Sequence, residues 1–177
     1  MIEVVVSRLG IDPNTQTYVV VLQEKNGPRL LPIWIGKPEA ESIVMHMHNV
    51  HRERPLTHDL CKTIIAGLGA TLRRVQITHV ESNTYFGELH LVRDGQLITV
   101  DSRPSDAIAI ALRLDAPLYA SEDLLVDPDE ESEEQGDESF LPPEIGPAST
   151  DASGMSAEQL QEYLEHLRPE DFGKFKL

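Results

Sequence analysis

Residues 101–113 read DSRPSDAIAIALR, and this stretch sets the pattern for the whole chain. An Arg-Pro pair stands between two aspartates, and a small apolar helix is predicted to follow from Asp106 to Leu114 because proline favours the first helical position. Residues 53–60, ERPLTHDL, repeat this order, with Arg-Pro before an aspartate at a helix start. The two Arg-Pro entrances are either two helix starts that need caps or two halves of one site.

The chain has 177 residues, which suits one domain with a sizeable core and an appendage. Its formal net charge of -15 is unevenly placed. Residues 1–126 hold 12 Lys and Arg against 15 Asp and Glu, whereas residues 127–177 hold 3 against 15. A nearly balanced domain at 1–126 is therefore predicted to carry an acidic tail.

Strand patterns alternate with helix patterns along the domain. Strands are predicted at 2–9, 17–24, 29–35, 72–80, 85–92, 96–101 and 117–120. Asn26-Gly27 and Asp94-Gly95 are strong hairpin signals. Each hairpin precedes a helix that opens near a proline, Pro38 or Pro104. This recurrence predicts a duplicated ββα unit.

Two of the predicted helices carry apolar stripes, which are Ala40, Ile43, Val44 and Met47 in one and Cys61, Ile64, Ile65 and Leu68 in the other. Cys61, the single cysteine, follows His58 by one turn and is either a nucleophile or a buried structural thiol, and the stripe favours the second. Trp34 is predicted to be a core anchor, with base stacking as the alternative.

The composition changes after the domain. Residues 127–154 are rich in acids, Pro, Gly and Ser, which predicts a disordered acidic linker. Residues 155–177 are predicted to contain a short docking helix with the stripe Leu160, Tyr163, Leu164 and Leu167. Its target is the same chain, a second subunit or another protein.

The two Arg-Pro entrances allow a structural and a chemical interpretation. In the first, Thr57 and Ser105 are N-caps, and the aspartates in the first turns favour the helix dipoles. In the second, the helix starts and their arginines bind a phosphodiester, and carboxylates or a histidine supply metal ligands or a general base. The residues concerned are Arg54, His58, Asp59, Asp101, Arg103 and Asp106. Glu39 lies in a first turn, where the helix dipole accounts for it.

Several stretches together resemble the bifunctional nuclease (DNase/RNase) domain family over roughly residues 1–126. They are LPIWIGKPEAESI, RPLTHDL, LGATLRRVQI and DSRPSDAIAIALRLDAPLYA, and the tail LQEYLEHLRPEDFGKF is similar to the C-terminal element of many bacterial members. The resemblance implies an α+β fold with an antiparallel or mixed sheet and flanking helices, a homodimer, and hydrolysis of DNA and RNA with little sequence preference. The signature residues are Arg54, Pro55, Thr57, His58, Asp59, Asp101, Arg103, Pro104, Ser105, Asp106 and Ala107.

A chemical hypothesis follows for these positions. Asp101, Asp106 and Asp59 are expected to bind Mg²⁺ or Mn²⁺. Arg54 and Arg103, with Thr57 and Ser105, are expected to hold the scissile phosphate. His58, together with the three aspartates, is expected to form the catalytic set, with the histidine activating water or protonating the leaving oxygen.

A second class of function stays open, because the domain has no basic stripe of the kind that binds nucleic acid. It is a non-enzymatic dimeric adaptor that binds a protein partner or a small anionic ligand, with the entrances as ion pairs. The acidic tail is alternatively an autoinhibitor that mimics nucleic acid. The sequence opens on strand-like MIEVVVSRLG, and its longest apolar run is 107–112, so we expect a cytoplasmic protein without a membrane span.

Overall fold

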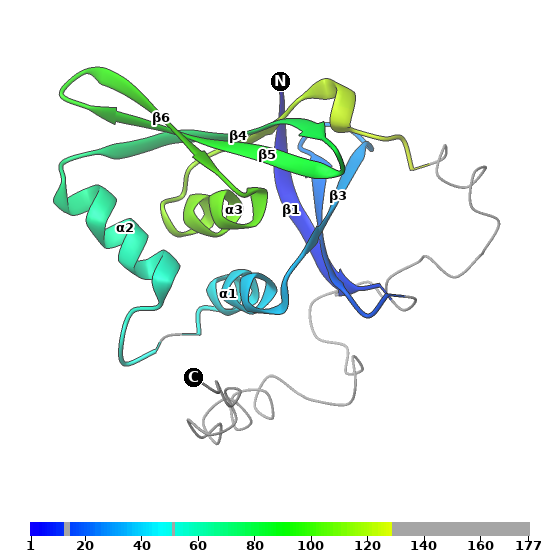
Figure 1. Ribbon diagram of the computed structural model, residues 1–177, viewed down its shortest axis with the longest axis horizontal. Coiled ribbons are helices and arrows are strands. Elements are labelled where there is room, and N and C mark those ends of the chain that lie inside the picture. Colours follow the sequence, from blue (N-terminus) through cyan, green and yellow to red (C-terminus); the bar gives the residue numbers. More distant parts are fainter. Residues whose placement is uncertain (13–14, 51, 129–177) are drawn as a thin grey trace. The chain divides into compact units, whose positions relative to one another are not determined.

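The computed structural model describes residues 1–12, 15–50 and 52–128 and shows an α+β fold (Figure 1). The elements are β1 Ile2–Ile11, β2 Tyr18–Glu24, β3 Leu30–Ile35, α1 Lys37–Met47, α2 Thr57–Gly67, β4 Thr71–Glu81, β5 Thr84–Arg93, β6 Gln96–Ser102, α3 Pro104–Arg113, β7 Leu118–Ala120 and the 3-10 helix η1 Glu122–Leu124. The strands and helices predicted within residues 1–126 are present, so the expectation of an α+β fold is confirmed.

Seven strands form one mixed sheet in the order β3-β2-β1-β7-β4-β5-β6. Every neighbouring pair is antiparallel except β4 and β7, which are parallel. Leu118 on β7 pairs with Val4 on β1 and with Val75 on β4, so this short strand joins two three-stranded antiparallel halves. The predicted duplication of a ββα unit is not established by this arrangement and stays a prediction.

The turn between β5 and β6 shows how local sequence determines strand register. Asp94 and Gly95 both have positive φ, 51° and 77°, as a type I′ turn requires. Arg93 pairs with Gln96 directly across this turn, and the register continues to Gly87 opposite Ser102. At Gly87, β5 passes close to the start of α3. A Cβ at this position would lie 3.4 Å from the Cα of Pro104, so a residue without a side chain suits it.

The three helices lie on the same side of the sheet, which curls around them (Figure 1). The central one, α3, is buried along nearly its whole length, including Ile108 at 0 % exposure. Its small side chains Ala107, Ala109 and Ala111 are also fully buried and leave room for close contact with the neighbouring elements. Burial of α3 therefore brings α1, α2 and the sheet into one core.

Some predicted core residues lie at the surface instead. On α2, Cys61 and Ile65 pack against the core, whereas Ile64 and Leu68 are 49 % and 57 % exposed. The helix lies at the margin of the core, so only part of its apolar surface is covered. Trp34 is also 49 % exposed, because it lies on the edge strand β3, where its Nε1 donates to Asp12 Oδ2 at 3.4 Å.

The linker predicted at 127–154 lies outside the described residues from 129 on, and so does the predicted helical tail at 155–177. Among the residues that the structure does describe, no helix has the length and apolar composition needed to cross a membrane.

The packing around α3 predicts that larger side chains will not fit. Ala111→Leu should lower the free energy of unfolding by about 1–3 kcal/mol, because the extra carbon atoms have no space at a fully buried position. Urea denaturation measures the change. Ala66→Leu, the same substitution on the exposed surface of α2, is the control and should be nearly neutral. Equal stability of the two variants would contradict the packing described for α3.

Candidate functional site

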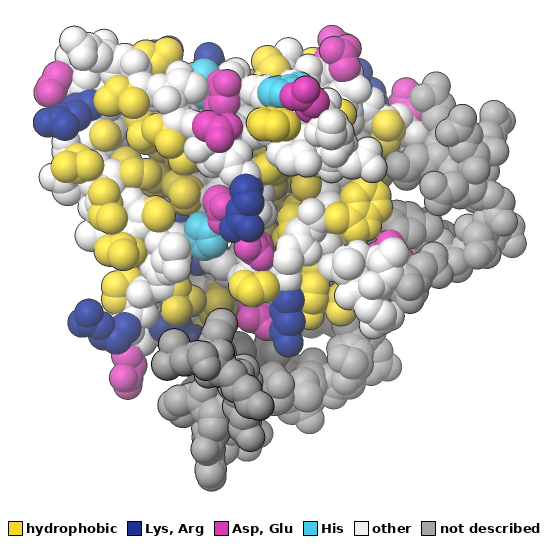
Figure 2. Space-filling view, in the orientation of Figure 1, with side chains coloured by type: hydrophobic (Ala, Val, Ile, Leu, Met, Phe, Trp, Pro, Cys, Tyr) yellow, Lys and Arg dark blue, Asp and Glu magenta, His cyan; other side chains and the backbone are white. Residues whose placement is uncertain are grey.

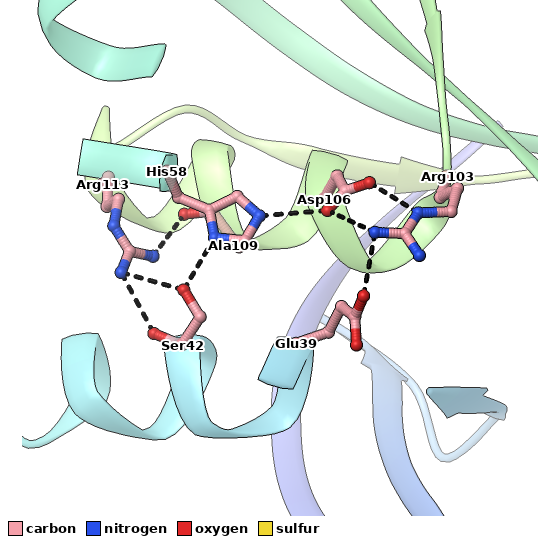
Figure 3. A network of polar contacts seen from close by, with 7 residues as sticks. All are labelled: Glu39, Ser42, His58, Arg103, Asp106, Ala109 and Arg113. Atoms are coloured by element: carbon pink, nitrogen blue, oxygen red, sulfur yellow. Dashed lines mark hydrogen bonds and ion pairs between the residues drawn. The ribbon is translucent and has the colours of Figure 1, made fainter. Parts of the chain in front are cut away.

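Polar and charged side chains from α1, α2 and α3 meet in one cluster (Figure 3). Glu39 comes from the first turn of α1, His58 from the start of α2, and Asp106 from the first turn of α3. Arg103, the residue that caps α3, contacts both Glu39 and Asp106. The first turns of α1 and α3 therefore meet at Arg103, an arrangement that favours anions, whereas α2 reaches the cluster through the His58 side chain and its own first turn lies beside Arg113.

His58 is held at both ring nitrogens. Its Nδ1 lies 2.7 Å from Ser42 Oγ, and its Nε2 lies 3.0 Å from Asp106 Oδ1. Arg113 donates to Ser42 Oγ at 3.1 Å, so the serine hydroxyl is free to donate its own proton to Nδ1. His58 Nε2 then donates to Asp106 Oδ1, and this ring orientation is assigned from the hydrogen-bond pattern.

Ser42, His58 and Asp106 are the residue types of a hydrolase triad, but the arrangement does not make Ser42 a nucleophile. Its side chain is buried at 5 % exposure and also accepts a hydrogen bond from Arg113. A serine nucleophile needs access to substrate as well as a neighbouring base. Ser42 therefore positions the imidazole ring and has no access to a substrate.

Arg103 is the most exposed member of the cluster, with 66 % of its side chain accessible. Its Nε donates to Asp106 Oδ2 at 2.7 Å, and its Nη2 lies 3.1 Å from Asp106 Oδ1 and 2.8 Å from Glu39 Oε1. The hydrogen bond and charge of Asp106 raise the pKa of Arg103. Its Nη1 makes no such contact with the described residues, which leaves donor capacity at the surface.

Asp106 is ionised at neutral pH. Burial alone would raise the pKa of its carboxyl, but the hydrogen bonds from Arg103 and His58 and the charge of Arg103 outweigh that effect, so the pKa lies below its ordinary value. Two donors from different helices converge on one carboxylate oxygen, Oδ1, at 3.0 and 3.1 Å. The position of Oδ1 is thus one at which the protein stabilises an anionic oxygen.

A second ion pair lies beside the cluster. Arg113 is 4 % exposed, and its Nε donates to Asp59 Oδ1 at 2.6 Å. The same guanidinium donates to the carbonyl oxygens of Ala109 and Ser42 at 3.0 and 3.1 Å. Burial acts to raise the pKa of Asp59. The hydrogen bonds from Arg113 and the Leu56 N–H lower the pKa by more than burial raises it, so the net shift is downward. This pair ties α2 to α1 and α3.

The predicted capping residues do not cap. Leu56 is the N-cap of α2 and Arg103 is the N-cap of α3. The N–H of Leu56 donates to Asp59 Oδ2 at 3.0 Å, so the carboxylate at the third helical position makes the reciprocal half of a capping box. Ser105 lies inside the first turn of α3 and is buried, because the helix begins one residue earlier at its proline.

The predicted site residues are only partly brought together. His58 and Arg103 both contact Asp106, whereas Asp59 belongs to the neighbouring pair. Asp101 is exposed and pairs with Glu88 across the sheet. Gly87 and Leu89 face the helices, so Glu88 between them faces the other way, and Asp101 shares the face of Glu88. Arg54 and Thr57 are exposed at the entry to α2. Within the described ranges, no three His, Cys, Asp or Glu side chains are grouped to hold a metal ion.

Two polar residues of the network had no part in the sequence hypothesis. Ser42 lies beside the buried Ala40 and Ile43 on α1, and a small polar residue among apolar neighbours gives little signal. Arg113 ends the apolar run 107–112 and lies two helical turns after Asp106, so the periodicity places it on the same face. That spacing was the available sign that an arginine belongs to the site.

Removal of the buried guanidinium tests the role of Arg113. Arg113→Met should lower the free energy of unfolding by about 3 kcal/mol, since it leaves the Asp59 carboxylate and the Ser42 carbonyl without their partner. Chemical denaturation measures the loss. Arg73→Met, at an exposed position of β4, is the matched control and should change stability by less than about 0.5 kcal/mol. A loss below about 1 kcal/mol in Arg113→Met would contradict the role assigned to this guanidinium.

The two carboxylates with lowered pKa values predict acid sensitivity. Because these pKa values are lower in the folded than in the unfolded chain, the stabilisation is complete above the unfolded value of about 4 and is lost as pH falls through the folded value. The free energy of unfolding should therefore fall as pH is lowered below about 4. Asp106→Asn and Asp59→Asn should each show a shallower fall in urea denaturation between pH 7 and pH 2.5. An unchanged slope in both variants would show that neither carboxylate is linked to folding.

The sequence model of the bifunctional nuclease domain matches residues 20–134 of this chain. This range includes all three helices, the strands β3 to β7 and most of β2. An uncharacterized protein of Mycobacterium tuberculosis (strain H37Rv) is 37 % identical over 175 residues, covering 96 % of this chain and 97 % of the mycobacterial protein.

Plant proteins match a shorter part of the chain. Bifunctional nuclease 2 of Oryza sativa subsp. japonica is 32 % identical over 112 residues, which cover 62 % of this chain and 34 % of the rice protein. Bifunctional nuclease 2 of Arabidopsis thaliana is 31 % identical over 106 residues, covering 58 % and 32 %. The aligned region thus spans about a third of each plant protein. With the family's domain model matching more than half of its length, this chain belongs to the bifunctional nuclease domain family.

Proposed function

We propose that this chain is a nuclease that hydrolyses phosphodiester bonds of DNA and RNA, with its site at Glu39, His58, Arg103 and Asp106. Membership of the family supports the activity, and so do the plant relatives that carry the name bifunctional nuclease. The choice of site rests on the geometry of the cluster. The reaction class is hydrolysis, in which water attacks phosphorus and an alcohol oxygen leaves.

One observation carries the proposal, which is the convergence of His58 Nε2 and Arg103 Nη2 on Asp106 Oδ1. The carboxylate oxygen stands where an oxygen of a bound phosphodiester would receive the same two hydrogen bonds. The helix ends that meet here add a favourable field for negative charge. Rotation of the Asp106 side chain would open this position, since the side chain is partly exposed at its surface end.

Each side chain then has a role at the phosphate. Arg103 binds the phosphate oxygens and stabilises the charge that develops on them. His58, in its imidazolium form, donates its Nε2 proton to the leaving oxygen, while the attacking water releases its proton to solvent. Asp106 gives up its position to the phosphate oxygen, and Ser42 keeps the imidazole oriented through Nδ1. Glu39 holds the guanidinium in place.

The metal hypothesis fits these residues poorly. Asp101 faces away from the helices, and the carboxylates of Asp59 and Asp106 are both bound by arginines. These three residues therefore do not form one Mg²⁺ or Mn²⁺ site in the described arrangement, and no step above passes through a metal. Dependence on either ion is a separate question, which the cleavage assay below answers directly.

The ion pairs also favour a second candidate function, a non-enzymatic adaptor that acts as a homodimer. Arg113 and Asp59 stabilise the contact between helices, and Arg103 is engaged by two carboxylates. In that case the cluster is a structural brace, and its loss would change stability without removing any activity. Cleavage assays distinguish the two candidates.

The first assay is cleavage of end-labelled single-stranded RNA and DNA by the purified full chain. His58→Gln should lower the cleavage rate by about 10²–10⁴-fold, because glutamine cannot transfer a proton. Arg103→Gln should lower the rate by about 10²-fold through lost stabilisation of charge on the phosphate. Mg²⁺, Mn²⁺ and EDTA are compared in parallel.

Asp101→Asn is the matched control for these variants. Asp101 lies on β6, the strand that leads into α3, and it faces the side of the sheet opposite to the cluster. The proposed site therefore predicts that Asp101→Asn keeps wild-type activity. Loss of cleavage in Asp101→Asn with activity retained in His58→Gln would place the chemistry elsewhere. Absence of cleavage in every sample would favour the adaptor, and equal cleavage in every sample would indicate a contaminating nuclease.

A further inference from the structure

The face of the sheet away from the helices (Figure 1) carries a row of three polar side chains. Leu89 on β5 faces the helices, so the next residue, His90, faces the other way. His90 pairs with Arg74 on β4 and with Thr99 on β6, and directly paired residues share a face of the sheet. An arginine, a histidine and a threonine thus lie side by side across three strands, and we call these three residues the outer row.

Two buried nitrogens of the outer row have no hydrogen-bond partner among the described residues. They are Nε of Arg74 and Nδ1 of His90, and His90 as a whole is only 7 % exposed. Buried polar atoms are nearly always hydrogen-bonded, because an unsatisfied one keeps the full cost of leaving water. Two such atoms on directly paired residues therefore indicate a site that a polar ligand completes.

The hydrogen bond at the other ring nitrogen defines what His90 can offer. Its Nε2 lies 2.9 Å from Glu88 Oε2, and a carboxylate only accepts hydrogen bonds, so Nε2 carries a proton. Nδ1 then accepts a hydrogen bond in the neutral ring and donates one in the imidazolium. Nε of Arg74 donates in either case. The ligand must therefore accept from the arginine, and it must be able to donate to the histidine or to accept from it.

A phosphate group meets these requirements. It presents several oxygens, and it exchanges a proton at about pH 6, so the same group can donate a hydrogen bond or only accept. A carboxylate lacks that proton at neutral pH, and a neutral hydroxyl brings no charge to the arginine. Thr99 adds an exposed hydroxyl on the other side of His90. We propose that Arg74, His90 and Thr99 bind the phosphate group of a small molecule.

The charges beside the outer row favour a single phosphate group. Arg73 lies in the bulge next to Arg74, is exposed and adds a second cation. Two acids lie in the next row along the strands, where Glu88 is engaged by His90 and Asp101 is exposed on β6. Two arginines thus face two carboxylates, and one of these carboxylates is already bound. The surplus of hydrogen-bond donors is therefore confined to the outer row itself.

The remaining charges nearby do not extend the outer row into a basic surface. Glu3 lies across β7 from this half of the sheet and is paired with Lys25 at 2.7 Å. On the side of the molecule drawn in Figure 2, the Lys and Arg side chains of the described residues also lie in small separate groups. A nucleic acid backbone needs a longer line of cations than these. The expected ligand is therefore a small phosphate compound, and the site is independent of the cleavage site proposed above.

A titration of the ¹⁵N-labelled full chain with inorganic phosphate at constant ionic strength tests the site. Amide signals of the outer row should shift along one saturable curve in heteronuclear NMR spectra. Arg74→Gln should weaken this binding by about tenfold, since it removes the charged donor that pairs with the phosphate. Arg93→Gln is the matched control, because Arg93 is an exposed arginine near the turn that joins β5 to β6, and this variant should keep wild-type affinity.

A 5′-mononucleotide is titrated in parallel to identify the source of the phosphate group. Tighter binding of the mononucleotide than of inorganic phosphate assigns the site to a phosphomonoester. Equal affinity for the two compounds assigns it to the phosphate ion alone. Either result supports a phosphate site at the outer row.

The contrary results are equally distinct. Shifts in the outer row that are absent or do not saturate overturn the proposal, as does an equal loss of affinity in Arg93→Gln. Loss of these shifts in Arg103→Gln would place the phosphate at the helix cluster and also overturn it. Phosphate can bind here without any cleavage, so failure of this proposal and failure of the proposed nuclease activity are separate results.

A second variant covers the case in which Arg74→Gln does not fold, which its NMR spectrum reports. Thr99→Val changes an exposed position of β6 and keeps the branched side chain, so it should fold. It should lower the affinity for phosphate by about threefold through the lost hydroxyl. Unchanged affinity in Thr99→Val would then overturn the proposal.

Discussion

The buried guanidinium of Arg113 is the contact on which the arrangement of the helices depends. It is almost inaccessible to water, and it reaches Asp59 on α2, the Ser42 backbone and hydroxyl on α1, and a carbonyl of its own helix. An arginine charge at this depth is stable only when its donors are satisfied. The three helices must therefore keep a fixed position relative to one another. The charged cluster between them is held in place by the same contacts.

The candidate site is a consequence of this geometry. Ser42 accepts a hydrogen bond from Arg113 and is hydrogen-bonded to one ring nitrogen of His58, whose other nitrogen donates to Asp106. A single directed chain of hydrogen bonds thus runs from a buried cation to a partly exposed carboxylate. It ends at Arg103, the most accessible charge of the group. The protein has in this way a buried inner part, which orients the imidazole, and an accessible outer arginine that is paired with two carboxylates.

The same fold leaves part of its apolar surface uncovered. Because α3 occupies the centre of the helical layer, α2 lies at the margin of the core and contacts it through one face only. The opposite sheet edge is better protected. There, β3 carries Pro32, which has no N–H to offer, and Leu30 exchanges backbone hydrogen bonds with Val126. The exposed apolar residues on α2 and β6 are thus concentrated on the half of the domain that follows α1.

The sequence by itself determined the elements, since strand alternation, the Asp94-Gly95 turn and the prolines at helix starts are local signals with local causes. It also predicted that His58, Arg103 and Asp106 could belong together, and the structure brings His58 and Arg103 into contact with Asp106. It did not show that Asp101 would face the other side of the sheet, or that Asp59 would pair with Arg113, because these relations depend on strand pairing and helix packing between distant residues. Likewise, the stripe of α2 indicated an apolar helix, but only the tertiary structure decided which of its side chains are covered, since burial is set by the neighbours that the fold supplies.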